Sequence, residues 1–315
     1  MSYELAIIGG GPAAAGAAVY AGRKQLSTIM IAEEIGGQSA VSETIYNWIG
    51  TPAIAGSALA SSLRAHVGEY APEKNGSVTL RTGVRVEKVA EGAADGAPFL
   101  LSLSNGETAE AKAVLVATGS RYRKLDVPGA ERFDNKGVMY CATCDGPLFS
   151  GFPVVVVGGG NAAFEAALQL SQYATAVTLM HRSDQFRADS ITIEKVKTDP
   201  KITIITNAQV VSIDGSALVE RLTYQINGED TVRDVAVSGV FVEIGQIPNT
   251  GLVEGLAALD DNKKIVTDPY TQRTSVTGLW AAGDCTNGKY HQNNIAVGDA
   301  VKALEDIYLW LKTGK

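Results

Sequence analysis

Two cysteines separated by two residues are the side chains best suited to chemistry in this sequence of 315 residues. Cys141 and Cys144 stand in the run 140–146, and Asp145 follows them at once. Two thiols at this spacing can close a small disulfide, and the motif can favour the nucleophilic thiolate of one of them. The carboxyl group of Asp145 could donate or accept a proton beside the pair. The pattern therefore predicts thiol–disulfide exchange.

Other interpretations of these side chains stay open. A zinc site needs four ligands, and apart from the pair the sequence offers only Cys285 and three scattered histidines, so no metal site is predicted. The two cysteines could also be inert buried thiols, and Asp145 could be a turn residue before Gly146. Cys285 has no cysteine near it in the sequence, and we expect it to be a small buried residue.

Glycines form two turns that each follow a short apolar run. Residues 9–11 come after the run 5–8, and residues 158–160 come after the run 154–157, 149 positions later. Both turns fit G-x-G-x-x-A, in which the first glycine allows a tight turn and the second lets the backbone approach a pyrophosphate. Such turns also serve purely structural roles, but a strand before and an alanine-rich helix after each turn favour two dinucleotide sites.

Further apolar runs have the spacing of strands in a parallel α/β sheet. Strands are expected at residues 28–32, 114–117, 176–180, 202–206, 240–244 and 279–282, and helices at 13–23 and 162–172. Turn-rich stretches at 118–124 and 245–251 indicate crossings between domains. We expect an α/β protein with two Rossmann-like domains. Residues 1–115 and 248–315 form the first domain. Residues 116–247 form the second domain, which is inserted into the first and contains the cysteine pair.

Each glycine turn and its helix are followed by a second strand, at residues 28–32 and 176–180. The residues directly after these two strands distinguish the two ligands. Glu33 lies 24 positions after Gly9 and could accept hydrogen bonds from ribose hydroxyls. The equivalent place after the strand 176–180 holds His181 and Arg182, and Arg187 follows shortly after them in the sequence. Basic residues there suit a ribose 2′-phosphate, so NADP is favoured over NAD. A solvated basic loop is the alternative.

The composition excludes some classes of partner. Acidic residues outnumber basic ones by 34 to 27, which gives a net charge of −7. This sign provides no electrostatic basis for binding nucleic acid or an anionic membrane. The uncharged stretches 5–22 and 44–63 contain glycine, proline or polar residues and resemble neither a membrane helix nor an export signal. We expect a cytoplasmic protein.

The sequence resembles the low-molecular-weight thioredoxin reductases, a family of pyridine nucleotide–disulfide oxidoreductases. The motifs stand in family order along essentially the whole chain, and CATCDG at 141–146 is the most specific of them. The others lie at residues 9–13, 36–38, 47–48, 117–119, 127–129, 158–163, 181–188, 244–250 and 281–284. The resemblance implies two three-layer ββα domains, FAD, NADPH, a homodimer, and a thioredoxin-like or glutaredoxin-like protein as electron acceptor.

The resemblance also assigns roles to residues. It places FAD along Gly9, Gly11, Pro12, Ala13, Glu33, Gly37, Gln38, Asn47, Gly283, Asp284, His291 and Gln292. It places NADPH along Gly158, Gly160, Asn161, Ala162, His181, Arg182 and Arg187. In this family hydride passes from NADPH to the flavin, which reduces the cysteine pair, and a domain rotation lets that pair alternate between flavin and partner. Cys144 would be the sulfur near the flavin, Cys141 the interchange thiolate, and Asp145 the proton donor or acceptor.

Three departures from the family pattern keep other functions open. Ser183 replaces the second arginine of a pair, which weakens the expected 2′-phosphate clamp, and His291 replaces an arginine at the FAD site. The run 282–286 is more similar to the flavoprotein subunit of alkyl hydroperoxide reductase, but the N-terminal thioredoxin-fold segment of that subunit is not expected here before Leu5. An NADH- or NADPH-dependent reductase of a peroxiredoxin system is therefore the alternative. A flavin-binding sensor without disulfide turnover is a third, disfavoured by the retained cysteine pair.

Overall fold

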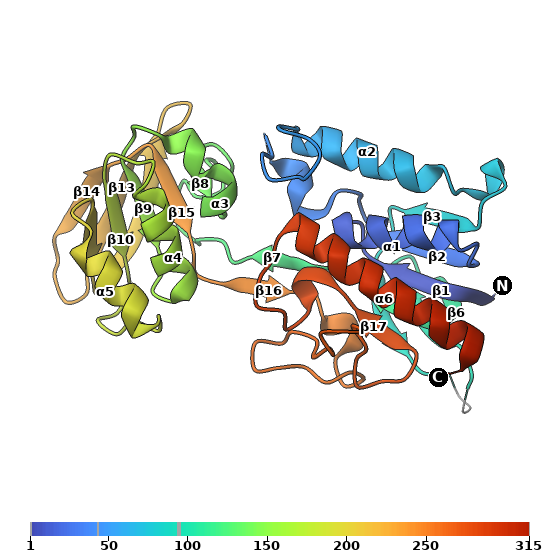
Figure 1. The fold of residues 1–315 in the computed structure, drawn as a ribbon. Coiled ribbons are helices and arrows are strands. Elements are labelled where there is room, and N and C mark those ends of the chain that lie inside the picture. The colour runs from blue at the N-terminus through green and yellow to red at the C-terminus, as the bar shows by residue number, and fades with distance from the viewer. Residues whose placement is uncertain (1, 43, 93–95, 315) are drawn as a thin grey trace. The chain divides into compact units, whose positions relative to one another are not determined.

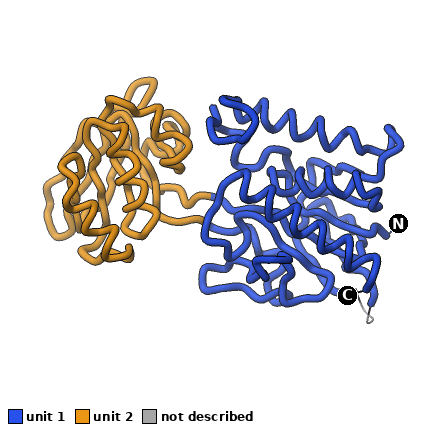
Figure 2. The backbone as a smooth tube through the Cα atoms, viewed as in Figure 1, with its two compact units in different colours: residues 1–121, 247–315 blue, residues 122–246 orange. Residues whose placement is uncertain are grey.

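The chain folds into two compact units, and the second is inserted into the first (Figure 2). The computed structural model describes residues 2–42, 44–92 and 96–314. Unit 1 comprises Met1–Arg121 and Ile247–Lys315, and unit 2 comprises Tyr122–Gln246.

Unit 1 is built on a sheet with the strand order β3-β2-β1-β6-β5-β4, in which β17 also pairs with β6. Strands β3, β2, β1, β6 and β17 run parallel, whereas β5 and β4 extend the sheet antiparallel. The strands are β1 (Ser2–Ile8), β2 (Thr28–Ala32), β3 (Val78–Thr82), β4 (Val86–Ala90), β5 (Phe99–Leu103), β6 (Thr108–Val116) and β17 (Leu279–Ala281). The chain leaves β1 for β2 on one side and later returns to β6 on the other. The carboxyl ends of β1 and β6 therefore form a topological switch point, where open α/β sheets bind ligands.

Alternate residues of β1 are buried in different layers of unit 1. Leu5 and Ile7 pack against helices α1 (Pro12–Arg23) and α6 (Asn293–Thr313), while Ile8 packs on the opposite face of the sheet with β4 and β5. Figure 1 shows α1 and α6 side by side over the first face. The small alanines of α1 are almost wholly buried and let this helix approach the sheet closely. Helix α2 (Gly56–Gly68) lies beside α1.

Unit 2 repeats this plan with a parallel sheet in the order β11-β10-β9-β15-β8. Its strands are β8 (Val138–Met139), β9 (Val154–Val157), β10 (Val177–Met180), β11 (Ile202–Ile205) and β15 (Gly239–Val242). A second, antiparallel sheet contains β12 (Ala208–Gly215), β13 (Val219–Ile226) and β14 (Val232–Ala236). The helices are α3 (Ala142–Asp145), α4 (Asn161–Leu170) and α5 (Ser190–Thr198).

The valines of β9 show why unit 2 has three layers. Val154 and Val156 pack in a core with α4, while Val155 and Val157 pack in a second core with residues of β12 and β13. A strand buried on both faces needs an apolar side chain at every position, which is why β9 reads as an unbroken apolar run. The expected three-layer ββα domain is confirmed.

The segments that connect the units pair with each other. Strand β7 (Ser120–Tyr122) and strand β16 (Gln246–Pro248) form a two-stranded sheet. The expected domain limits were 116 and 248, whereas the contacts divide the chain at Tyr122 and Ile247. Val116 ends β6, and residues 117–121 stay with unit 1 because they follow this strand directly, with Ala117 N donating a hydrogen bond to Ile8 O of β1 at 2.8 Å.

Every expected strand and both expected helices are present in the structure, with ends that differ by a few residues. The strands β3 to β5 and β12 to β14 come in addition to those expected, as do α2, α5 and α6. In the part of the chain that the structure describes, each helix is too short or too polar to span a lipid bilayer.

Replacement of Gly9 by alanine is expected to destabilise unit 1. The φ of Gly9 is +132°, and a Cβ there would lie 2.2 Å from Ala117 O, which belongs to the backbone of the central sheet. Because the sheet cannot yield as a flexible side chain would, we expect Gly9→Ala to lower the free energy of unfolding by at least about 2 kcal/mol. Urea unfolding without added ligand measures this loss.

Gly68→Ala is the matched control for that substitution. Gly68 ends α2, and no heavy atom outside its immediate surroundings lies within 4 Å of the position of an added Cβ. Alanine there should leave the free energy of unfolding unchanged or raise it by up to ~1 kcal/mol. Equal stability of the two variants would contradict the close approach at Gly9.

Candidate functional site

A cavity of about 730 Å³ opens at the switch point of unit 1, where β1, β2 and β6 end. This volume is in the range of small-molecule and cofactor sites. Its lining contains Gly9, Gly11, Pro12, Ala13, Glu33, Gly37, Gln38, Gly283 and Asp284, all of which were predicted from the sequence. It also contains Arg85, Thr118, Ser120, Asn249 and Asn293, which were not predicted.

The glycine turn leaves bare backbone at this cavity. Gly11 is the N-cap of α1 and offers no side-chain hydrogen bond to the first turn, so N–H groups there need another partner. Gly37 faces it, and a Cβ on Gly37 would lie 3.1 Å from Gly11 Cα. Because neither residue carries a side chain, an anionic group can approach the N-terminus of the helix closely. The geometry fits a dinucleotide pyrophosphate.

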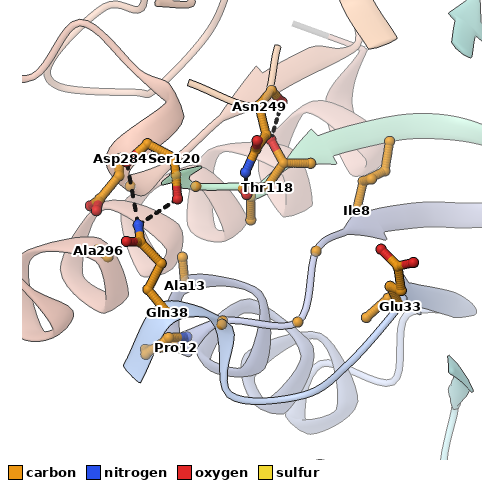
Figure 3. Close-up of a pocket in the computed structure, with 18 of the residues that line it drawn as sticks. Ile8, Pro12, Ala13, Glu33, Gln38, Thr118, Ser120, Asn249, Asp284 and Ala296 are labelled. Atoms are coloured by element: carbon orange, nitrogen blue, oxygen red, sulfur yellow. Dashed lines mark hydrogen bonds between the residues drawn. The ribbon is translucent and has the colours of Figure 1, made fainter. Parts of the chain in front are cut away.

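Polar groups of different kinds mark the two ends of the cavity. Figure 3 shows Glu33 at one end and Gln38, Ser120 and Asp284 at the other, where Pro12 and Ala13 also lie. The carboxylate of Glu33 can accept hydrogen bonds from ribose hydroxyls, as its position after β2 predicts. At the opposite end the amide of Gln38 donates to Ser120 O. Two ends with different chemistry suit an asymmetric dinucleotide.

Three predicted residues lie outside the lining of the cavity but are joined to its rim. Asn47 Nδ2 donates to Gln292 Oε1 at 2.8 Å, and Gln292 is the N-cap of α6. His291 Nδ1 lies 3.5 Å from Asp284 Oδ1. Asn47 is also held by Asn294, which donates to its backbone carbonyl at 2.7 Å. The structure therefore brings these segments together although they lie about 245 residues apart in sequence.

The second glycine turn has a similar form at the switch point of unit 2. Gly160 is the N-cap of α4 without a side-chain hydrogen bond, and nothing lies within 4 Å of a Cβ added to it. The ring of His181 fills the space beside Gly159, where an added Cβ would meet it at 2.3 Å. Arg187 N donates to Gly159 O at 2.8 Å, so the basic loop lies against the turn. Asn161 Oδ1 accepts from Asp189 N at 2.7 Å and fixes the same loop.

The basic side chains of this loop are available to a ligand. Arg182 and Arg187 are both exposed, and Ala162 beside the turn is exposed too. Within the described ranges, no carboxylate forms an ion pair with either guanidinium group. Two such guanidinium groups beside a dinucleotide turn can bind a phosphate.

The structure joins the predicted redox pair in a disulfide. Cys141 and Cys144 are bonded, with a Cα–Cα distance of 5.3 Å. Cys141 is the N-cap of the short helix α3, and its Sγ accepts a hydrogen bond from Cys144 N at 3.1 Å. Both residues are only partly buried. The pair is therefore a partly exposed disulfide rather than two inert buried thiols.

Asp145 has the acidity that a proton-transfer group needs. It is the last residue of α3, and burial raises its pKa from the ordinary value of 3.8 to about 6. A carboxyl group with this pKa can take up and release a proton near neutral pH, and it lies next to Cys144 in the chain. Asp145 is also the N-cap of the 3-10 turn Gly146–Phe149, so it stands at a turn as well as beside the pair.

Glu243 is a titratable residue of unit 2 that the sequence analysis missed. It follows β15, and its carbonyl oxygen would lie 2.4 Å from a Cβ on Gly158, so it borders the second glycine turn. Burial, and to a lesser extent the charge of Glu165 on α4, raise the pKa of Glu243 to about 8. The available signal was a single acidic residue inside the apolar run 240–244.

The third cysteine is a core residue, as expected. Cys285 is fully buried, and burial raises the pKa of its thiol to about 11. Its Sγ lies 3.5 Å from Val116 O in the centre of unit 1. Among the residues that the structure describes, no group of three or more His, Cys, Asp or Glu side chains is placed to hold a metal ion.

Comparison with known proteins assigns the family. The model of the pyridine nucleotide-disulphide oxidoreductases matches residues 3–300. The chain belongs to this family. The resemblance to thioredoxin reductases seen in the sequence is confirmed.

Among solved structures, a thioredoxin reductase from Streptococcus pyogenes is 35% identical with a TM-score of 0.88, and each chain is covered to 99%. One from Giardia duodenalis is 31% identical with a TM-score of 0.89 and the same coverage. Both share the two Rossmann-like domains.

Some curated relatives with a similar percentage of identical residues are not named thioredoxin reductases. An NADH dehydrogenase of Bacillus subtilis is 38% identical over 301 residues, and an alkyl hydroperoxide reductase component of Escherichia coli is 36% identical over 304 residues. Each alignment covers 96% of this chain but only 57% of the relative. The chain thus spans little more than half the length of these family members.

Counting reactive thiols tests the assigned states of the three cysteines. We expect no thiol of the oxidised, native protein to react with Ellman's reagent at pH 8, because two are bonded and Cys285 is buried with a raised pKa. Mild reduction should expose two thiols, and denaturation after reduction should expose all three. A reactive thiol in the oxidised native protein would refute this assignment.

Proposed function

We propose that this chain is an FAD-dependent thioredoxin-disulfide reductase, which passes electrons from NADPH through the flavin and the Cys141–Cys144 disulfide to a thioredoxin-like or glutaredoxin-like protein. The observation that carries the proposal is a partly exposed disulfide in a chain with two dinucleotide-binding turns. A chain that holds two dinucleotides and a redox disulfide has every group needed to convert hydride into thiol reducing power.

FAD is proposed to occupy the cavity of unit 1. Gly9 and Gly11 would leave room for its pyrophosphate at the N-terminus of α1, and Glu33 would accept hydrogen bonds from the adenosine ribose. The remaining half of FAD would then extend toward Gln38 and Asp284. Asn47 and Gln292 would support that end from behind through the hydrogen bond between them, and His291 through its contact with Asp284 at 3.5 Å. When bound, the flavin supplies the two-electron chemistry between nucleotide and disulfide.

NADPH is proposed to bind at the second turn. Gly158, Gly160, Asn161 and Ala162 would present the N-terminus of α4 to its pyrophosphate, beside His181. The exposed guanidinium groups of Arg182 and Arg187 support a ligand with an additional 2′-phosphate.

Three side chains would carry out exchange with the protein partner. With the pair reduced, the Cys141 thiolate attacks one sulfur of the partner's disulfide and releases the other sulfur as a thiolate. Cys144 then attacks Cys141 Sγ, which restores the Cys141–Cys144 bond and leaves the partner with two thiols. Asp145, with a pKa of about 6, would accept the proton of Cys144 before this attack. The partner gains two electrons and the pair loses two.

The setting of the reaction is also a proposal. We infer a homodimer in the cytoplasm that acts on a protein disulfide and binds neither nucleic acid nor membrane. The net charge of −7 and the likeness to thioredoxin reductases support this setting.

A reductase that serves a peroxiredoxin system is the second candidate. The 36–38% identity to components of alkyl hydroperoxide reductases and to an NADH dehydrogenase favours it, as does Ser183 beside Arg182. A flavin-binding sensor is disfavoured, because a sensor without disulfide turnover has no use for the bonded pair.

Anaerobic stopped-flow reduction separates these functions. The oxidised holoprotein is mixed with NADPH or NADH while flavin absorbance is followed, and thioredoxin or the small redox protein of a peroxiredoxin system is added afterwards. The proposal predicts fast bleaching by NADPH and reoxidation by thioredoxin. Fast bleaching by NADH alone would favour the peroxiredoxin system, and no reoxidation by either acceptor would favour the sensor.

Alanine at the second glycine of each turn should separate the two nucleotide sites. Gly11→Ala and Gly160→Ala both place a methyl group where no close contact opposes it, so both variants should fold. Each methyl group would obstruct the approach of a pyrophosphate. Gly11→Ala should lose FAD affinity by about tenfold or more, and Gly160→Ala should lose NADPH affinity while retaining FAD. Apoprotein titrations check both, and the reverse pattern would overturn the assignment.

Removal of the Asp145 carboxyl group should slow only thiol–disulfide exchange. Asp145→Asn cannot accept a proton, and proton transfer of this kind contributes about 100-fold or more to rate. We expect flavin reduction by NADPH at the wild-type rate, with reoxidation by thioredoxin slowed by about that factor. In the wild type, reoxidation should also slow below pH 6, where Asp145 is protonated. A wild-type reoxidation rate in the variant would remove Asp145 from the mechanism.

Nucleotide affinity should depend on pH through Glu243. Its carboxyl group is mostly neutral at pH 7 and ionised above pH 8, because its pKa is raised to about 8. Ionisation adds negative charge beside the turn that would hold a pyrophosphate, so NADPH affinity should fall by about fivefold between pH 7 and pH 9. Glu243→Gln should abolish this dependence in isothermal titration, with Glu194→Gln on exposed α5 as control. An unchanged pH profile in Glu243→Gln would contradict the expectation.

A further inference from the structure

Three charged or polar side chains form a line from a surface loop to the cavity of unit 1. Lys264 Nζ lies 2.7 Å from His291 Nε2, and His291 Nδ1 lies 3.5 Å from Asp284 Oδ1. Asp284 lines the cavity, whereas Lys264 and His291 stand behind it. His291 and Asp284 are partly buried.

The hydrogen-bonding capacity of lysine fixes the state of His291. An ammonium group only donates hydrogen bonds, so Nε2 of His291 must be the acceptor and carries no proton. In a neutral ring the proton then sits on Nδ1, which is the nitrogen that faces Asp284. The imidazole thus lies between a cation and an anion.

Both ends of this line are held in place by the fold. Lys264 N donates to Asp260 Oδ1 at 2.9 Å, and Asp260 N donates to Lys264 O at 2.8 Å, which closes a tight loop. Asp284 lies between Gly283 and Cys285, both of which are buried. Neither the lysine backbone nor the aspartate can therefore move far without breaking contacts in unit 1.

Asp284 lies at the end of the cavity opposite to Glu33 (Figure 3). Because Glu33 is the ribose acceptor of the adenosine half, the redox-active ring of FAD extends toward Asp284. A lone carboxylate at that end would oppose both an anionic cofactor and the negative charge gained on reduction. The positive charge of Lys264 offsets it.

We propose that Lys264 is a positioning residue which, through its hydrogen bond to His291, holds Asp284 at the flavin end of the cavity and increases both the FAD affinity and the reduction potential of the bound flavin. The inference rests on the proposed function, since it requires FAD in the cavity of unit 1. None of the three side chains exchanges protons or electrons with the substrate in this role.

Variants of Lys264 test whether its positive charge affects the binding and the reduction potential of FAD. Lys264→Met removes the cation, so FAD should bind about threefold to tenfold more weakly to apoprotein, and the reduction potential of bound flavin should become more negative. Lys264→Arg should restore both properties, because a guanidinium group can also donate to Nε2. Lys263→Met is the matched control, since it removes the same charge from the neighbouring residue, whose Nζ pairs with Glu254 at 3.2 Å.

Variants of His291 test whether this side chain links Lys264 to Asp284, without any change at Lys264. The amide introduced by His291→Gln can accept from Lys264 and donate to Asp284, so this variant should keep the wild-type potential. His291→Leu can do neither and should behave as Lys264→Met does. Potentials are measured by equilibration with a reference dye, and affinities by flavin fluorescence quenching on addition to apoprotein.

The outcomes separate this inference from the proposed function. A wild-type protein that binds no FAD would refute the proposed function. A wild-type protein that binds FAD while Lys264→Met and His291→Leu keep its potential and affinity would refute the role of Lys264 alone. Equal changes of FAD affinity and reduction potential in Lys263→Met and Lys264→Met would also refute it. The effect would then depend only on the net charge of the loop and not on the contact of Lys264 with His291.

Discussion

The close approach of backbone segments at the glycine turns is the constraint on which the rest of the structure depends. At Gly9 the chain passes so near Ala117 O that a methyl group would overlap it, and at Gly158 it passes almost as near Glu243 O. These approaches bring the carboxyl ends of three strands together at each switch point. The N-termini of α1 and α4 then face the same point with bare backbone. One local arrangement used twice thus suits two anionic dinucleotides.

Burial sets the acidity of the groups around these sites. Asp145, Glu243 and Cys285 all have pKa values raised mainly by burial, since a low-dielectric surrounding disfavours the charged form. The consequences differ with the ordinary pKa of each group. The carboxyl of Asp145 titrates near neutral pH and suits proton transfer, whereas the thiol of Cys285 stays protonated and inert. One physical effect thus separates a reactive group from a structural one.

The sequence was sufficient to predict the features that depend on local patterns. The apolar run before Gly158 must be a strand buried on both faces, and the spacing of Cys141 and Cys144 permits a disulfide without knowledge of the fold. Contacts between distant segments could not be predicted in this way. Asn47 meets Gln292 only because the chain returns to unit 1 after unit 2, and Lys264 meets His291 across 27 residues within the returning segment. Glu243 was missed because its raised pKa arises from burial, and the presence of one acidic residue in an apolar run does not show that this residue is buried.

In the proposed mechanism a flavin and the Cys141–Cys144 disulfide exchange electrons within one chain. Its most direct test is the number of electrons that the oxidised holoprotein accepts in an anaerobic dithionite titration, which does not depend on nucleotide preference. We expect four electrons per chain, two for the flavin and two for the disulfide, and only two for Cys144→Ser. Uptake of only two electrons by the wild type would show that the disulfide is not in redox contact with the flavin and would contradict this mechanism.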